Sequence, residues 1–212
     1  MGLPPKWYQF LVGVFASFGS FLYGYDLGVI AEVVASNTFV AKFHPNDVQQ
    51  GLVVSMFTTG AFFGAALAGP CGDYLGRRLT IMTGGIIFML GGSLQTGATN
   101  LSFLWSGRFL AGLGVGFLTM IVPLYQAELA HPSIRGRITA LQQFMLGVGA
   151  LVASWVSWAT YRDLKTTNAQ WRIPLGLQLI PAFFLSLLIL LFPESPRYVL
   201  QLSQYRKAYV DV

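Results

Sequence analysis

The chain has 212 residues, of which 54% are hydrophobic and 10% are charged, and its net charge is +5. A soluble domain carries roughly 25% charged residues, so this composition excludes an ordinary soluble protein and indicates a membrane protein with several spans. The basic residues stand singly or in pairs, which argues against a nucleic-acid-binding surface. The single cysteine, Cys71, excludes an internal disulfide bond and a cysteine-rich metal site.

Six apolar stretches are each long enough to cross a bilayer. They are continuously apolar rather than alternating, which favours helices over the strands of a membrane barrel. The first stretch is also too long for the core of a cleavable signal peptide. The sequence therefore predicts an all-α membrane protein with transmembrane helices at residues 8–30, 50–69, 79–98, 103–127, 138–160 and 173–192, and a short polar loop between the first two.

The distribution of lysine and arginine between the loops predicts the orientation. With the N-terminus inside, the cytoplasmic loops and tails hold eight basic residues and the outer loops hold four. Both termini are therefore expected in the cytoplasm. The cytoplasmic set is Lys6, Arg77, Arg78, Arg135, Arg137, Arg197, Arg206 and Lys207, and the outer set is Lys42, Arg162, Lys165 and Arg172.

Two opposite charges lie within apolar stretches. Arg108 opens the run GRFLAGLGVG of the fourth span, and Asp26 lies in YGYDLGVI of the first. A charge at membrane depth is costly and requires a partner or a wet cavity, so we expect Asp26 and Arg108 to form a functional pair. The competing interpretation is that the first helix has already reached water at Asp26.

Acidic and basic residues recur together in the three loops on the predicted cytoplasmic side. In the first of these loops, GDYLGRR, we expect Asp73 near a helix N-terminus and both arginines at the lipid headgroups. Ion pairs among the loops would brace the helices while this side is closed, and exchanging the charges of Glu128 and Arg197 tests that hypothesis. The expected network consists of Asp73, Arg77, Arg78, Glu128, Arg135, Glu194 and Arg197.

The second and fifth spans contain small or polar residues with a structural meaning. Gly60 and Gly64 stand at four-residue spacing, which predicts close helix packing. Gln142 and Gln143 lie about one turn into the fifth span, and buried glutamines are costly unless hydrogen-bonded. They either bridge helices or face a polar ligand. Catalytic pairs, phosphate loops and metal clusters are not evident, so we expect no enzyme activity, cofactor or metal.

Several of these motifs resemble those of the sugar porter family of the major facilitator superfamily. GDYLGRR resembles its loop after the second span, PLYQAELAHPSIRGR its motif after the fourth, and PESPRY its motif after the sixth. GYDLGV and GRFLAGLGVG also match, so the resemblance covers essentially the whole chain. The stretch AELAHPSIRGRITALQQ is particularly similar to fungal sugar transporters.

The resemblance implies a fold and a division of the chain. Family members have twelve spans in two six-span halves, each made of two inverted three-span repeats. The chain resembles the N-terminal half, with a membrane bundle at residues 1–192 and the start of a cytoplasmic linker at 193–212. A C-terminal half, from a missing segment or another chain, is then an expected partner.

The resemblance also implies a function. It predicts transport of a hexose or related compound by alternating access across the plasma membrane, coupled to protons through Asp26 and Arg108. Gln143 matches a position that contacts sugar hydroxyls, Tyr23 one that lines the pocket, and Gln142 is its neighbour. Expected partners are the sugar, the proton and the lipid bilayer, and no nucleic acid.

Three departures from the family pattern leave the substrate open. Tyr74 stands where arginine is usual and is expected to weaken the ion-pair network, and His131 stands where proline is usual. Ala150 occupies a position where some sugar symporters carry a second glutamine. The alternatives are transport of another polyol, disaccharide or sugar acid, a non-transporting sugar sensor, which usually has a long cytoplasmic tail, and an inactive truncated fragment.

Overall fold

The computed structural model describes residues 5–164 and 167–200, and all regular secondary structure in these ranges is helical. Six segments are long and apolar enough to cross a membrane. The prediction of an all-α protein with six spans is therefore confirmed, although most spans extend beyond the predicted bounds into polar ends. In chain order they are Trp7–Ala35, Asp47–Leu75, Arg77–Thr96, Leu101–Leu129, Pro132–Asp163 and Ala169–Leu191.

The first and last spans are each built from two consecutive helices. Ser17 and Gln178, at the two junctions, both keep right-handed helical backbone angles, so each span continues in nearly one direction. The helices of these two spans are α1 (Pro5–Ala16), α2 (Phe18–Ala35), α8 (Ala169–Leu177), α9 (Leu179–Leu188) and the 3₁₀ turn η1 (Ile189–Leu191). The other spans are single helices, α4 (Asp47–Leu75), α5 (Arg77–Thr96), α6 (Leu101–Leu129) and α7 (Pro132–Asp163).

A short helix, α3 (Asn37–Phe43), replaces part of the polar loop expected after the first span. The Phe39 side chain is fully buried, and its ring centroid lies 5.0 Å from that of Phe43 and 6.1 Å from that of Trp171. A helix this short is unstable alone and depends on tertiary packing. The prediction missed α3 because Trp171, which packs against Phe39 and Phe43, lies far away in the sequence.

Glycines bring the helix backbones into direct contact along three seams. A Cβ atom on Gly60 of α4 would overlap the Phe109 carbonyl oxygen of α6, and one on Gly24 of α2 would overlap the Leu146 carbonyl oxygen of α7. Gly114 of α6 similarly leaves no room for a Cβ beside α5. The predicted close packing of the second span is confirmed. We call these contacts α4–α6, α5–α6 and α2–α7 the glycine seams.

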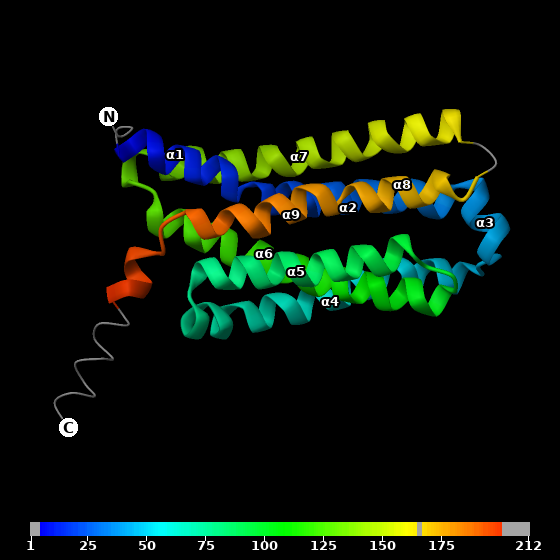
Figure 1. Cartoon of the computed structure of the whole chain (residues 1–212), viewed down its shortest axis with the longest axis horizontal. Coiled ribbons are helices and arrows are strands. Elements are labelled where there is room, and N and C mark those ends of the chain that lie inside the picture. The colour runs from blue at the N-terminus through cyan, green and yellow to red at the C-terminus, as the bar shows by residue number, and fades with distance from the viewer. Residues whose placement is uncertain (1–4, 165–166, 201–212) are drawn as a thin grey trace, which may run out of the picture.

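The long helices run side by side along one axis of the molecule (Figure 1). Because the number of spans is even, the start of α1 and the 3₁₀ turn η1 lie at the same end of the bundle, and α3 lies at the other. We call these the terminal end and the α3 end. The arrangement places Asp26 of α2 and Arg108 of α6 inside the bundle between these ends.

Candidate functional site

The expected contact between Asp26 and Arg108 is present in the bundle interior. The Nη1 atom of Arg108 donates to Oδ1 of Asp26 at 2.7 Å and to Oδ2 at 2.8 Å. The Asp26 residue is 0% exposed and Arg108 is 1% exposed. The carboxylate therefore has no direct access to solvent in this conformation.

Other polar contacts of Arg108 extend the site to four helices. Its Nε atom donates to the backbone carbonyl of Val53 on α4 at 3.2 Å, and Nη1 lies 3.3 Å from the amide oxygen of Gln95 on α5. The Gln95 amide nitrogen donates in turn to the carbonyl of Gly107 at 3.2 Å. The guanidinium thus joins α2, α4, α5 and α6 at one point. Sequence reasoning missed Gln95, because a single glutamine near a span end is also typical of an interface with water.

Aromatic rings cover the charged pair on one side. The Phe57 ring lies under the guanidinium, 4.4 Å from Cζ of Arg108 to the ring centroid, in a cation–π contact. The Tyr23 ring stacks on Phe57 with centroids 6.4 Å apart and an interplanar angle of 12°. Tyr23 is half-buried, so this stack connects the buried ion pair to a side chain that a ligand can contact.

The two glutamines of α7 have different surroundings. Gln142 is buried, with 8% of its surface exposed, whereas Gln143 is exposed. Neither side chain forms a hydrogen bond with another residue in the part of the chain that the structure describes. The amide of Gln143 is thus free to bind a polar ligand or an additional protein segment.

A cluster at the terminal end contains part of the expected ion-pair network. Arg77 binds both carboxylate oxygens of Glu128, with Nε–Oε2 at 3.1 Å and Nη2–Oε1 at 3.2 Å. Its Nη1 atom lies 3.1 Å from Oδ1 of Asp73 and donates to the carbonyl of Gly72 at 2.8 Å. Ser195 adds a hydroxyl donor to Glu128, which the sequence did not indicate. This cluster joins α4, α5, α6 and the segment after η1.

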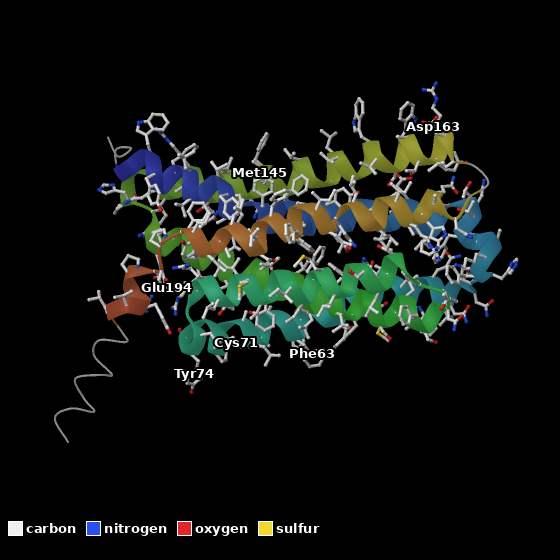
Figure 2. The ribbon with its side chains drawn as sticks, in the orientation of Figure 1. Phe63, Cys71, Tyr74, Met145, Asp163 and Glu194 are labelled. Atoms are coloured by element: carbon white, nitrogen blue, oxygen red, sulfur yellow. The ribbon has the colours of Figure 1, made fainter. Side chains whose placement is uncertain are left out.

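Glu194 has a different role from the one expected of an ion-pair partner. Its Oε1 atom accepts from the backbone N–H groups of Arg77 at 3.0 Å and Arg78 at 3.3 Å, and therefore caps the start of α5. Figure 2 shows Glu194 on the segment beside that helix start. The carboxylate is stabilised there by the helix N-terminus.

One local expectation for the GDYLGRR loop is wrong, and it concerns the arginines. Asp73 lies in the last turn of α4, and its carboxylate contacts the side chain of Arg77, the first residue of α5. Arg77 is only 3% exposed and does not lie at the headgroups, because its guanidinium binds the carboxylate of Glu128 inside the bundle. Arg78 donates to the backbone carbonyl of Leu190, so it binds a helix end and not a carboxylate.

The structure does not bring Arg135 and Arg197 into this cluster. Both are exposed, and neither forms an ion pair with any residue in the ranges 5–164 and 167–200. Arg135 lies in the first turn of α7 with its side chain at the surface. Glu128 pairs with Arg77 and not with Arg197. Exchanging the charges of Glu128 and Arg197 therefore cannot restore a contact between these two residues.

Tyr74, one of the departures from the family pattern, points away from the bundle (Figure 2). Its side chain is 85% exposed, and its backbone carbonyl accepts a hydrogen bond from the Tyr198 hydroxyl at 3.2 Å. The Tyr74 side chain therefore takes no part in the Arg77–Glu128 cluster in this conformation.

We expect the Arg77–Glu128 contact to stabilise the bundle measurably. Arg77→Gln should lower the free energy of unfolding by about 2 kcal/mol, because a hydrogen bond to a charged group contributes roughly 1.5–3 kcal/mol. Thermal unfolding in detergent of Arg77→Gln, Glu128→Gln and the double variant gives the coupling between them. The matched cycle of Glu128→Gln with Arg197→Gln should be additive. Additivity in the first cycle would contradict the assignment.

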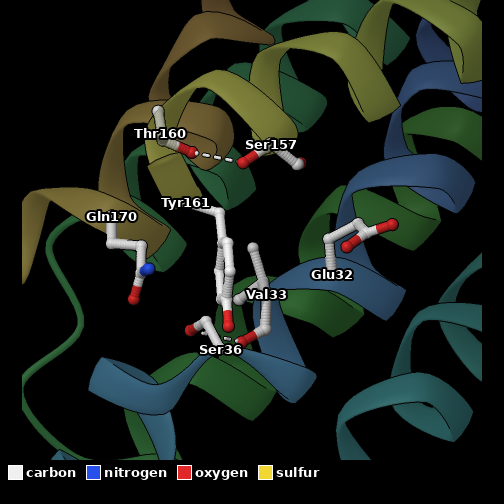
Figure 3. Close-up of a pocket in the computed structure, with 7 residues that line it drawn as sticks. All are labelled: Glu32, Val33, Ser36, Ser157, Thr160, Tyr161 and Gln170. Carbon is white, nitrogen blue, oxygen red and sulfur yellow. Dashed lines mark hydrogen bonds between the residues drawn. The ribbon is translucent and has the colours of Figure 1, made fainter. Parts of the chain in front are cut away.

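A small pocket lies near the α3 end, between α2, α7 and α8 (Figure 3). Its volume is about 20 Å³, and it is lined mainly by polar residues. The Thr160 hydroxyl donates to the Ser157 carbonyl at 3.0 Å, whereas the buried Ser157 hydroxyl has no partner among the described residues. The space suits one water molecule and is too small for a sugar. The lining residues are Glu32, Val33, Ser36, Ser157, Thr160, Tyr161 and Gln170.

Six apolar helical spans around a buried ion pair define an integral membrane protein that crosses the bilayer several times. A family model described as "Sugar (and other) transporter" matches residues 12–209. The chain therefore belongs to the sugar transporter family of membrane proteins.

The relatives and solved structures agree on this family. A probable quinate permease of Aspergillus niger is 38% identical over 204 residues, which cover 92% of the chain and 38% of the permease. The high glucose sensor RGT2 of Saccharomyces cerevisiae is also 38% identical over 204 residues, covering 93% of the chain and 26% of the sensor.

The fold corresponds to half of a known transporter structure. The proton:xylose symporter XylE of E. coli, of the major facilitator superfamily, superposes with a TM-score of 0.84 at 28% identity. The match covers 93% of this chain and 47% of XylE. The chain thus has the fold of a six-helix half of this superfamily, and it spans less than half the length of each protein compared.

Proposed function

We propose that the chain is one half of a transporter that moves a sugar or related polyol by alternating access, coupled to protons. The observation that carries this proposal is the fully buried contact of Asp26 with Arg108. Buried ionisable groups in membrane helices are costly and typical of ion and proton pathways. The similarity to XylE, described as a proton:xylose symporter, supports the same interpretation.

Asp26 is the proposed proton carrier and Arg108 its counter-charge. Arg108 attracts the Asp26 carboxylate and donates to both of its oxygens. Protonation would remove this attraction and free α2 to move relative to α6. A substrate that binds better to one of the two arrangements is then linked thermodynamically to the proton.

The proposed substrate contacts are Gln143, Gln142 and Tyr23. The exposed amide of Gln143 offers a donor and an acceptor to sugar hydroxyls. Tyr23 would convey substrate binding to the ion pair through Phe57, since its ring stacks on Phe57 and that ring covers Arg108. A second six-helix half, from the same or another chain, would complete the cavity between the two bundles.

The Arg77–Glu128 cluster is proposed to brace the terminal end when that side is closed. The excess of lysine and arginine that the sequence assigns to the side of the N-terminus supports a cytoplasmic location for both termini, and the plasma membrane is the proposed location of the protein. Residues 193–212 are proposed as the start of a cytoplasmic linker, although residues 201–212 lie outside the described ranges.

A sugar sensor that does not transport is the second candidate, because the high glucose sensor RGT2 matches nearly the whole chain. Such a protein would bind a sugar without moving it across the membrane. Binding and transport measured on the same preparation separate the two functions.

Uptake of labelled hexoses and labelled quinate in a transporter-deficient yeast tests the proposal. The chain is expressed alone and together with the C-terminal half of a related transporter, with and without a protonophore. We expect uptake that needs both halves and that the protonophore abolishes. Substrate binding without uptake would favour the sensor, and the absence of both binding and uptake would contradict the proposal.

A further inference from the structure

Two cations lie close together at the α3 end, apart from the Asp26–Arg108 site. They are Lys42, in the last turn of α3, and Arg172, on α8. Both side chains donate to the backbone carbonyl oxygen of Ala98, Lys42 at 3.3 Å and Arg172 at 3.4 Å. The Trp171 ring lies beside both, 5.1 Å from Nζ of Lys42 and 5.1 Å from Cζ of Arg172. The two positive charges thus share one neutral acceptor.

This cation pair lacks an acidic partner in the chain as described. None of the ion pairs in residues 5–164 and 167–200 involves Lys42 or Arg172. The Nε atom of Arg172 is buried and has no hydrogen-bond acceptor among these residues. Partial burial and the nearby Arg172 charge both lower the pKa of Lys42. Like charges held together in this way favour binding of an anion.

A groove of about 580 Å³ runs from Arg172 along α8 toward the middle of the bundle. Its upper part is polar, with Thr96, Thr167 and Asn168 near the arginine. Its lower wall is apolar and exposed, with Ile173 at 44%, Leu177 at 36% and Ile180 at 54%. These three residues follow one face of α8 and the start of α9 at helical spacing.

We propose that this groove binds a membrane phospholipid, with the lipid phosphate on Arg172 and Lys42 and one acyl chain along Ile173, Leu177 and Ile180. Charge complementarity places an anion at the cation pair. The apolar wall identifies the anion as a lipid headgroup, because a free phosphate would leave that wall unused. The proposal is independent of whether the chain transports a sugar.

Native mass spectrometry of the full 212-residue chain in detergent tests the headgroup contact. The probe is phosphatidylglycerol with one palmitoyl and one oleoyl chain, compared with phosphatidylcholine of the same chains. Arg172→Gln should weaken phosphatidylglycerol binding by about tenfold, because a charge-assisted hydrogen bond is lost, and Lys42→Gln should act in the same direction. The matched control is Arg162→Gln, whose exposed guanidinium stacks on Trp158 outside the groove.

Gly176, which lines the groove, provides the test of the acyl-chain contact. A Cβ atom there would lie 3.4 Å from Cγ2 of Thr96, an ordinary contact, so Gly176→Ala should fold and bind lipid normally. Gly176→Phe should fill the groove and reduce lipid binding without changing the charges, and its thermal unfolding midpoint checks that it folds.

Inorganic phosphate, added as a competitor, distinguishes a lipid headgroup from a free phosphate as the anion that binds the cation pair. We expect little competition at millimolar phosphate, because the acyl chain adds binding energy that phosphate lacks. Full competition, with lipid binding unchanged in Gly176→Phe, would overturn the proposal in favour of a free-anion site. Equal binding by the parent chain, Arg172→Gln and Lys42→Gln would overturn it altogether.

Discussion

Asp26→Asn is expected to abolish accumulation of substrate against a gradient while leaving exchange across the membrane. Asparagine has nearly the same shape and still accepts from Arg108, but it cannot carry a proton. A gradient of one pH unit is worth about 1.4 kcal/mol and sustains up to a roughly tenfold concentration ratio. In the variant this ratio should fall to about one. Labelled substrate uptake and counterflow, with the second half co-expressed, measure the two activities.

Glu32→Gln is the matched control for this variant. Glu32 lies on the same helix as Asp26, but its side chain is exposed and it has no ion-pair partner in the described ranges. Accumulation should therefore remain. Accumulation by Asp26→Asn equal to that of the parent would exclude Asp26 as the proton carrier, even if uptake itself were confirmed.

Arg108→Met is expected to destabilise the bundle severely. The change leaves the Asp26 carboxylate fully buried without its counter-charge, and breaking a buried ion pair in this way costs about 3–5 kcal/mol. It also removes the contacts with the Val53 carbonyl and with Gln95. Thermal unfolding in detergent and the yield of monodisperse protein measure the effect.

The double variant Asp26→Leu with Arg108→Met should recover most of the lost stability. Replacing a whole buried ion pair by apolar side chains is often neutral or stabilising. We expect this protein to fold and not to accumulate substrate, which would separate the structural effect of the pair from its role in coupling. If Arg108→Met instead unfolded at the same temperature as the parent, the buried Asp26 side chain would not need Arg108 as a counter-charge for stability.

The sequence predicts the spans well because a bilayer imposes a minimum length of apolar residues on every crossing helix. It also predicts the contact of Asp26 with Arg108, since each is the other's only plausible counter-charge within an apolar segment. Both predictions rest on energetic costs so large that few alternatives remain.

The details of the terminal end could not be predicted in the same way. Several acids and bases occupy neighbouring loops, and each has more than one partner of opposite charge. Which pairs form depends on where α4 ends and α5 begins. Because α5 begins at Arg77, Glu194 caps its first backbone N–H groups, and Glu128 forms the ion pair with the Arg77 side chain. The helix α3 was missed for a related reason, because it packs against Trp171, which is distant in the sequence.

The glycine seams divide the bundle into two mechanical units. One consists of α4, α5 and α6, and the other of α2 and α7, and along each seam the glycines let the two helix backbones touch. The contact of Asp26 with Arg108 spans the boundary between them. If Asp26 is the proton carrier, as proposed, protonation would weaken one of the contacts that join these two units, whereas the hydrogen bonds from Gln126 of α6 to Gly13 and Ser17 of the first span would remain.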